Sequence, residues 1–298
     1  MGNEVTVIAR RSLVAPWKTA LWDAVSLGGW LRTLDGADVV INLAGRSVDC
    51  RYNARHKVEI LESRVRTTKL IGEAIKSVAT PPTVWINAST ATIYRHASDR
   101  AMDEQSSALG GTEAGVPQAW RFSTEVARGW EDAFFAAATP RIRKIALRSA
   151  MTLSPDTGGV FDALLRLVRI GLGGRFGTGR QYVSWIHERD FVGAVEFLIA
   201  NEHISGAVNV SAPNPVMNTE FMTILREAWG TTVGLPSSKW MLEFGALFLR
   251  TETELILKSR RVVPGRLLRQ GFTFEFPQWR EAARDLVSSW RKQHRGGA

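Results

Sequence analysis

The feature that most constrains the fold of this chain is an alternation of short apolar runs with longer amphipathic segments. Asp38–Ala44 is apolar almost throughout, as expected for a strand that is buried on both faces, and Thr83–Ser89 and Lys144–Arg148 are similar. Between these runs, Ala54–Val78 repeats apolar residues near helical spacing, and Gln118–Ala138 does so with a period of four. This alternation predicts an α/β fold in which helices cover both faces of a doubly wound parallel sheet.

Weaker signals extend the same pattern along the chain. The sequence predicts further strands at Glu4–Arg10, Ala20–Asp23 and Val208–Val210, and further helices at Phe161–Ile170, Phe191–Asn201 and Thr219–Trp229.

The character of the sequence changes after Gly234-Leu235-Pro236. An apolar stripe from Trp240 to Phe248 predicts a helix, and a capping-box pattern at Thr251–Glu254 predicts a second one, which Pro264-Gly265 is expected to end. A last amphipathic helix is predicted at Trp279–Trp290. We therefore expect a small, mostly helical C-terminal unit over residues 235–290, after a first domain over residues 1–234.

Charge and apolar content narrow the classes of partner. The 298 residues carry a net charge of +9, but the basic residues are spread along the chain, and the densest group, at residues 258–269, is interpreted as a solvated helix face. Apolar runs are interrupted by charge within about 12 residues, too short for a membrane span of about 20. The single cysteine, Cys50, allows no internal disulfide. We expect a cytoplasmic protein with a small-molecule substrate, no nucleic-acid partner and no membrane anchor.

In an open parallel sheet, ligands bind at the carboxyl ends of the strands, so the residues that come directly after each strand matter most. Arg10 and Arg11 come after the first predicted strand, where dinucleotide-binding folds place an acid for NAD or a cation for the 2′-phosphate of NADP. Two arginines there favour NADP over NAD. The alternative is a pair of exposed loop arginines with no ligand.

Several motifs together resemble one family. They are Asn42-Leu43-Ala44-Gly45, Glu59–Arg64, Trp185–Asp190, Arg261–Pro264 and Gly271–Phe274. This set resembles the extended short-chain dehydrogenases/reductases, in the NAD-dependent epimerase/dehydratase-like branch that carries a C-terminal domain of unknown function. The resemblance implies a Rossmann-type fold and an NADP-binding oxidoreductase or epimerase-like protein. It leaves the oligomeric state open between a monomer and a homodimer.

The resemblance also assigns residues to the cofactor. It implies that Ala9 and Arg10 lie at the adenosine phosphate, and that the backbone of Leu43 and Ala44 contacts the cofactor. It places Glu59 and Arg64 at polar helix positions that face the cofactor cleft, and Ser149 and Met151 near the nicotinamide. His187 and Asp190 match the loop-to-helix motif that is common to extended members. For Glu59 and Arg64 the alternative is an exposed helix pair, and for His187 and Asp190 it is a structural role or a helix cap.

The chain departs from the family pattern at its beginning. Family members start with a strand, a glycine-rich turn and a helix, whereas this chain starts at the turn into the strand near Glu4. We expect Met1 to be a truncated or misassigned start. The strands beginning near Glu4 and Asp38 would then lack a shared neighbour, and the pyrophosphate would lack its helix N-terminus, which puts cofactor binding by this chain in question.

The second departure concerns catalysis. The Tyr-x-x-x-Lys pair of the superfamily is replaced by about Ser123 and Ala127, and a serine hydroxyl is too weak an acid for that role. Ser89 and Tyr94 are the conditional catalytic candidates, although Tyr94 can equally be a packing residue. Whether the protein is an enzyme is therefore open. The hypotheses are an NADP-dependent oxidoreductase or epimerase, a non-catalytic NADP-binding or regulatory protein, and an anion- or nucleic-acid-binding protein.

Overall fold

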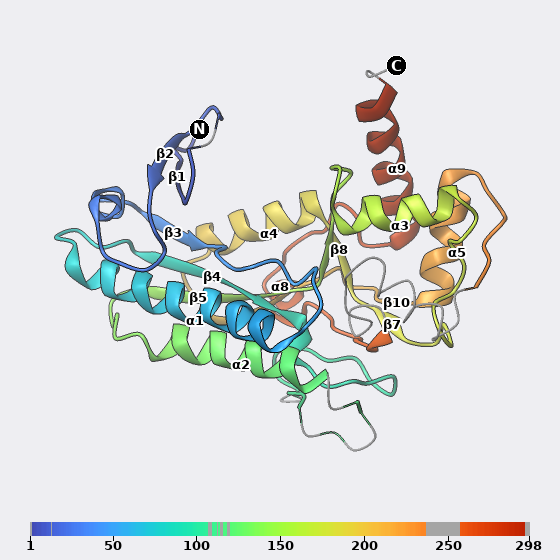
Figure 1. The fold of residues 1–298 in the computed structure, drawn as a ribbon, viewed down its shortest axis with the longest axis horizontal. Helices are drawn as coiled ribbons and strands as arrows, with labels where there is room; N and C mark the ends of the chain where they lie inside the picture. Colours follow the sequence, from blue (N-terminus) through green and yellow to red (C-terminus); the bar gives the residue numbers. More distant parts are fainter. Residues whose placement is uncertain are drawn as a thin grey trace.

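A parallel sheet of four strands forms the centre of the computed structural model, which describes residues 2–12, 14–106, 109–111, 113, 116–117, 120–236 and 257–295. Its strand order is β3-β4-β5-β9, and every neighbouring pair is parallel (Figure 1). These strands are β3 (Val39–Asn42), β4 (Val84–Thr90), β5 (Arg143–Ser149) and β9 (Gly206–Val210). The predicted fold class is confirmed, and each of these strands lies on or beside its predicted run.

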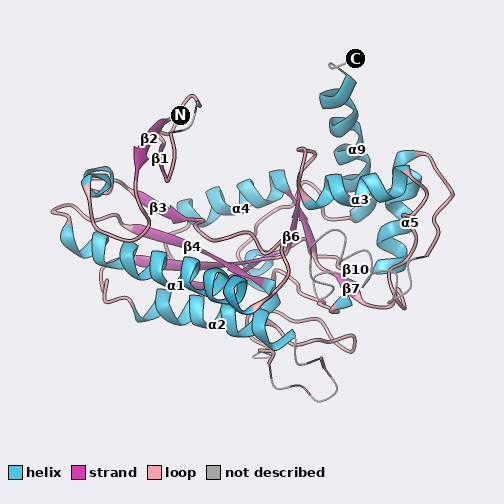
Figure 2. Ribbon diagram, viewed as in Figure 1, coloured by secondary structure: helices cyan, strands magenta, loops and turns pink. Residues whose placement is uncertain are grey.

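Helices cover both faces of this sheet (Figure 2). Alternate residues of β4 point to opposite sides, so that Trp85 packs against α1 (Ala54–Ser77) and α2 (Arg121–Ala136). Val84 and Ile86 instead pack in the core formed with α4 (Glu188–Ala200). Burial of apolar side chains on both faces explains why the predicted strands are almost continuously apolar.

The first two strands form a separate sheet. β1 (Thr6–Ala9) pairs in parallel with β2 (Lys18–Leu21), and within the described residues neither strand pairs with β3. Ile8 and Ala20 nonetheless pack in the same core as the α1 face of the central sheet, together with η1 (Gly29–Thr33). The expectation that the strands near Glu4 and Asp38 are not joined is therefore confirmed, whereas the short strand expected at Ala20–Asp23 begins two residues earlier.

Another core lies beyond the end of the central sheet that is far from β1 and β2. It is built around α3 (Val160–Arg169), α5 (Asn218–Trp229) and α9 (Trp279–Arg295), with Phe161, Phe221 and Trp279 among its fully buried side chains. Sequence periodicity did not predict four short strands, because two or three residues are too few to show a period. They are β6 (Met151–Leu153), β7 (Tyr182–Val183), β8 (Trp185–His187) and β10 (Val216–Met217).

The structure corrects two predictions for the C-terminal unit. Pro264-Gly265 does not end a helix, because residues 258–264 are not helical and α8 (Gly265–Arg269) begins there. The basic group at 258–269 is not a solvated helix face either, since Lys258 is only 3% exposed.

The helices expected near Trp240–Phe248 and at Thr251 lie outside the described residues. Leu267 and Phe274 pack in the α4 core, and the domain boundary at residue 234 stays a prediction.

No helix in the described part of the chain is both long and apolar enough to cross a membrane.

The core around α3 should contribute strongly to stability. Substituting Phe161→Ala is expected to lower the free energy of unfolding by about 3–5 kcal/mol, because it leaves a cavity where a fully buried ring was. Phe135→Ala, at a ring that is 41% exposed, is the matched control and should cost clearly less. Urea denaturation of both variants measures the difference, and equal losses would contradict the assigned packing.

Candidate functional site

Two buried asparagines lie where β3 ends beside the middle of β4. Asn42 Nδ2 donates to Asn87 Oδ1 at 2.6 Å and to Thr68 Oγ1 of α1 at 3.2 Å. Asn42 Oδ1 in turn accepts the backbone N–H of Ala44 at 3.0 Å. The side chain that ends β3 therefore fixes the turn through Leu43 and Ala44. Leu43 is 65% exposed, so this part of the backbone lies at the surface.

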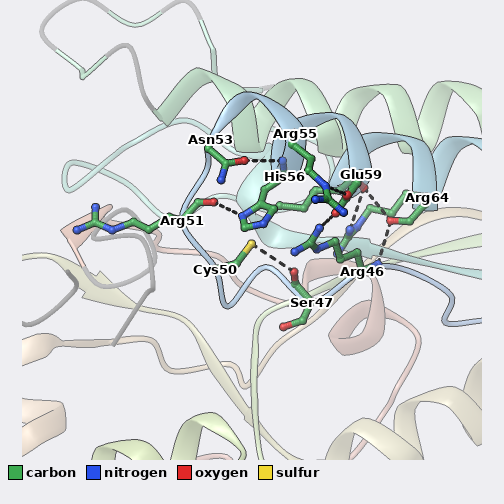
Figure 3. Close-up of polar contacts among 11 residues, drawn as sticks. Arg46, Ser47, Cys50, Arg51, Asn53, Arg55, His56, Glu59 and Arg64 are labelled. Atoms are coloured by element: carbon green, nitrogen blue, oxygen red, sulfur yellow. Dashed lines mark hydrogen bonds and ion pairs between the residues drawn. The ribbon is translucent and has the colours of Figure 1, made fainter. Parts of the chain in front are cut away.

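The loop after this turn leads into the first turn of α1 (Figure 3). Arg46 and Arg55 both form ion pairs with Glu59, at 2.7 Å in the case of Arg55 Nε. Arg46 N–H donates to Ser63 Oγ at 2.9 Å, and the Asn53 side chain caps the helix by accepting from His56 N at 2.8 Å. Because an acidic side chain is held by two guanidinium groups here, the loop presents excess positive charge beside the end of β3.

Arg64 lies one turn further along α1. Its guanidinium stacks over the Trp130 ring at 5.0 Å and donates to the Ile60 carbonyl at 3.0 Å. Burial lowers the pKa of this guanidinium from its ordinary value, although it stays charged at neutral pH. A Cβ at Gly45 would lie 3.1 Å from the Arg64 Cζ atom, so only a glycine lets the loop pass this close without shifting the arginine. The structure thus brings Ala44, Glu59 and Arg64 to one side of the same loop, although Glu59 and Arg64 do not pair with each other.

The predicted phosphate-binding residues lie on the separate sheet. Ala9 ends β1, and its carbonyl accepts from Trp22 N at 3.1 Å. Arg10 and Arg11 come directly after it, and both are exposed. Within the part of the chain that the structure describes, neither forms an ion pair.

The two catalytic candidates belong to a buried polar network. Glu131 of α2 and Arg148 of β5 form a bidentate ion pair at 2.9 and 2.7 Å. Ser89 Oγ donates to Glu131 Oε1 at 2.6 Å, and Arg148 Nη1 donates to the Tyr94 hydroxyl at 3.0 Å. That hydroxyl donates to Asn209 Oδ1 at 2.9 Å, which links the network to β9. Ser89 and Tyr94 are therefore brought together through Glu131 and Arg148.

Burial and charge set the protonation of this network. Tyr94 is 1% exposed, and its burial raises the pKa of the phenol, an effect that the nearby Arg148 charge only partly offsets. The phenol is therefore protonated at neutral pH and is fully engaged by its two partners. This arrangement stabilises the junction of α2, β5 and β9.

The remaining predicted positions lie near the end of β5. Ser149 Oγ donates to the Leu147 carbonyl at 3.3 Å, and Met151, half-buried, starts β6 with its N–H on the Ser184 carbonyl. His187 caps α4 by accepting from Arg189 N at 3.1 Å, and its Nε2 lies 3.2 Å from Asp285. Asp190 accepts the backbone N–H groups of Glu275 and Phe276. The structure gives His187 and Asp190 the capping and structural contacts that the sequence left open as alternatives.

Sequence reasoning missed Glu131, Arg148 and Asn209 as members of a site. A signal was present, since Glu131 lies among the apolar positions of α2, beside Trp130, and Arg148 ends an apolar strand. A charge at a buried position requires a partner, but the pattern alone does not say which one. On the same helix, Ser123 and Ala127 stand where a Tyr-x-x-x-Lys pair was sought, and Ala127 is fully buried.

Comparison with known proteins identifies related sequences and structures. The profile of the "NAD dependent epimerase/dehydratase family" matches residues 1–211, and a "Domain of unknown function (DUF1731)" matches residues 238–286. The mouse epimerase family protein SDR39U1 is 32% identical over 96% of this chain and 92% of its own.

Two solved structures are similar over most of the chain. The human SDR39U1 protein, crystallised with NADPH, is 28% identical with a TM-score of 0.83, over 96% of this chain and 92% of that one. A nucleoside-diphosphate sugar epimerase from Corynebacterium glutamicum is 31% identical with a TM-score of 0.70, over 94% of this chain and 52% of its own.

The ion pair between Glu131 and Arg148 can be tested with a double-mutant cycle. Either Glu131→Gln or Arg148→Met is expected to cost about 3–5 kcal/mol of unfolding free energy, because each leaves the other charge buried without its partner. The double variant should cost less than the sum of the two. Urea denaturation of the three variants measures this coupling, and strictly additive losses would show that the pair does not act as a unit.

Proposed function

Because the chain belongs to the NAD-dependent epimerase/dehydratase family, we propose that it binds NADP(H) at the carboxyl edge of its parallel strands and acts there on a small-molecule substrate. The family and the Rossmann-type fold predicted from the sequence are both confirmed by the matches above. The choice of NADP over NAD and the residues that carry it are our proposal.

The observation that carries the proposal is the pair Arg10 and Arg11 at the carboxyl end of β1. Both guanidinium groups are exposed, and the described residues offer neither of them a carboxylate. A guanidinium group matches the geometry of a phosphate and binds it through two parallel hydrogen bonds. The 2′-phosphate of NADP is such a partner, whereas the 2′-hydroxyl of NAD is matched by an acid at this position. The NADPH in the human relative supports the same choice.

The residues after β3 fit the rest of the cofactor. Leu43, Ala44 and Gly45 present exposed backbone that Asn42 holds in place, and small side chains at two of these positions allow a ligand to approach closely. Arg46, paired with Glu59, and the half-buried Arg64 supply positive charge beside this backbone. We assign Ala9, Arg10, Leu43, Ala44, Glu59 and Arg64 to the cofactor side of the site, and Met151 to its nicotinamide side.

A bound nicotinamide would supply hydride chemistry, so the question for this chain is which of its residues moves a proton. The Tyr94 phenol donates to Asn209 and accepts from Arg148, and Ser89 donates to Glu131. Proton transfer by Tyr94 would have to break this network. This observation favours a second candidate function, a non-catalytic NADP-binding or regulatory protein.

The role of the two arginines can be tested by binding. Arg10→Gln combined with Arg11→Gln is expected to weaken NADPH binding by about tenfold or more, because a charge-assisted contact with the 2′-phosphate is lost. Affinity for NADH, which lacks that phosphate, should hardly change. Isothermal titration of both nucleotides measures the effect, with Arg100→Gln together with Arg121→Gln as a charge-matched control. Parallel losses for NADPH and NADH, or none for either, would overturn the assignment.

Measurements of stability and of its pH dependence can distinguish a structural role of Tyr94 from a catalytic one. Tyr94→Phe is expected to lower the free energy of unfolding by about 1–3 kcal/mol, because Arg148 and Asn209 lose a buried partner. The raised pKa of the folded phenol means that its contribution is complete below about pH 10 and falls as pH rises, since the unfolded phenol ionises first. The wild type should thus lose more stability than the variant between about pH 9 and pH 11. An unchanged NADPH affinity in the variant places Tyr94 outside the cofactor contacts, and a selective loss of turnover would instead identify it as catalytic.

A further inference from the structure

The helices α3, α5 and α9 lie far from β1 along the molecule (Figure 1), and a group of aromatic and basic side chains lies where they meet. Trp229 of α5 and Trp290 of α9 pack edge to face, with ring centroids 5.8 Å apart. With Arg291 and His294 they line a depression of about 490 Å³. Beside it, α9 and the end of α5 form a second depression of about 310 Å³, which Arg284 and Lys292 line. The two depressions share Arg291, so they form one surface.

The tryptophans hold two of the guanidinium groups of this surface. Arg291 lies 4.3 Å from the Trp229 ring centroid, and Arg169 of α3 lies 4.9 Å from that of Trp290. Arg291 also donates to the Trp229 carbonyl at 2.6 Å. Cation–π contacts orient a guanidinium group without neutralising its charge. Both arginines therefore keep their full positive charge toward an incoming ligand.

Three nearby acids already have other partners. Asp162 accepts from Trp290 Nε1 and pairs with Arg166, Glu227 pairs with Arg280, and Asp285 pairs with Arg189. The basic surface is defined as Arg169, Arg284, Arg291 and Lys292. Within the described ranges of the chain, none of its four members forms an ion pair.

The dimensions of the basic surface favour a ligand with several phosphates. Arg284 and Lys292 are eight residues apart on one helix, which corresponds to about 12 Å along its axis. Cations spread over this length of helix match successive phosphates of a phosphodiester backbone better than they match a single inorganic phosphate.

An exposed ring lies beside these cations. His294 stacks on Trp290 with ring centroids 3.9 Å apart and an interplanar angle of 12°. Its Nδ1 lies 2.8 Å from the Trp290 carbonyl, and its Nε2 lies 3.3 Å from the Thr157 hydroxyl, so both ring nitrogens have partners and the ring is fixed. His294 is exposed and lines the first depression together with Trp290.

We propose that the basic surface binds single-stranded nucleic acid, with its cations along the phosphate backbone and an unpaired base stacked on His294. Proteins that bind single strands commonly place cations along the phosphate backbone and an aromatic ring on which a base stacks. An unpaired base is free to stack on such a ring, whereas a base within a duplex is already stacked between its neighbours. This inference goes beyond the proposed cofactor function and uses none of its residues. It also departs from the expectation of no nucleic-acid partner, which rested on basic residues that are spread along the sequence.

The test is fluorescence anisotropy of a labelled oligouridylate of about 12 nucleotides, titrated with the full chain at several salt concentrations. Each neutralised phosphate contributes about −0.7 to the slope of log affinity against log salt, so four cations predict a slope of about −2.8. Arg284→Gln with Lys292→Gln should reduce its magnitude by about 1.4. Lys69→Gln with Lys76→Gln, which removes the same charge from α1, should leave the slope unchanged. His294→Ala should weaken binding about fivefold or more.

Three outcomes would overturn the proposal. They are equal losses in the α9 and α1 double variants, no binding at low salt, and duplex DNA or anionic phosphatidylserine vesicles bound as tightly as the single strand. Circular dichroism and NADPH titration of the α9 double variant accompany the assay. Both should match the wild type, so a failure of the cofactor proposal stays distinguishable from a failure of this one.

Discussion

The buried ion pair between Glu131 and Arg148 connects the parts of this fold that matter for function. It joins α2 to β5 directly, reaches the end of β4 through Ser89, and reaches β9 through Tyr94 and Asn209. Two charges at buried positions are tolerated only when each satisfies the other and the surrounding polar atoms. The pair therefore requires α2, β4, β5 and β9 to meet in one arrangement. Ser89 and Tyr94, the two catalytic candidates from the sequence, both form hydrogen bonds with this pair.

At the carboxyl edge of the sheet, the residues that stabilise the fold differ from those that we propose to bind the cofactor. Asn42 and Asn87 are buried and hold the end of β3 to the middle of β4, while the backbone directly after Asn42 is exposed. On the separate sheet, the arginines after β1 are exposed and have no carboxylate among the described residues. The buried Asn42 and Asn87 side chains thus satisfy each other, and the unpaired charges of Arg10 and Arg11 lie at the surface, where an anionic cofactor can reach them. The cations beside α9 obey the same rule at the other end of the molecule.

Parts of this organisation can be predicted from the sequence because they depend on local periodicity. The runs at Asp38–Ala44 and Thr83–Ser89 are almost continuously apolar, which is typical of strands in a parallel sheet that helices cover, and the structure confirms both strands. β4 is buried on both faces, whereas Ile41 of β3 is 44% exposed. Strands as short as β7 and β10 leave no such pattern, because two residues are too few to show a period. Each of these strands is instead stabilised by pairing with the other, which lies more than 30 residues away in the sequence. Pro264-Gly265 illustrates a different limit, since the same dipeptide can end one helix or begin another, and the residues after it decide between the two.

The sequence by itself determined the fold class, the family and the presence of cations after the first strand, because each is encoded in residues close together in the chain. Only the tertiary structure decided which charges are paired. Tyr94 and Asn209 are 115 residues apart, and Arg169 reaches Trp290 from a different helix. Contacts of this kind depend on how helices pack against the sheet and against one another, and no local pattern specifies them. That is why the buried network around Glu131 and the basic surface of α9 became visible only in the folded chain.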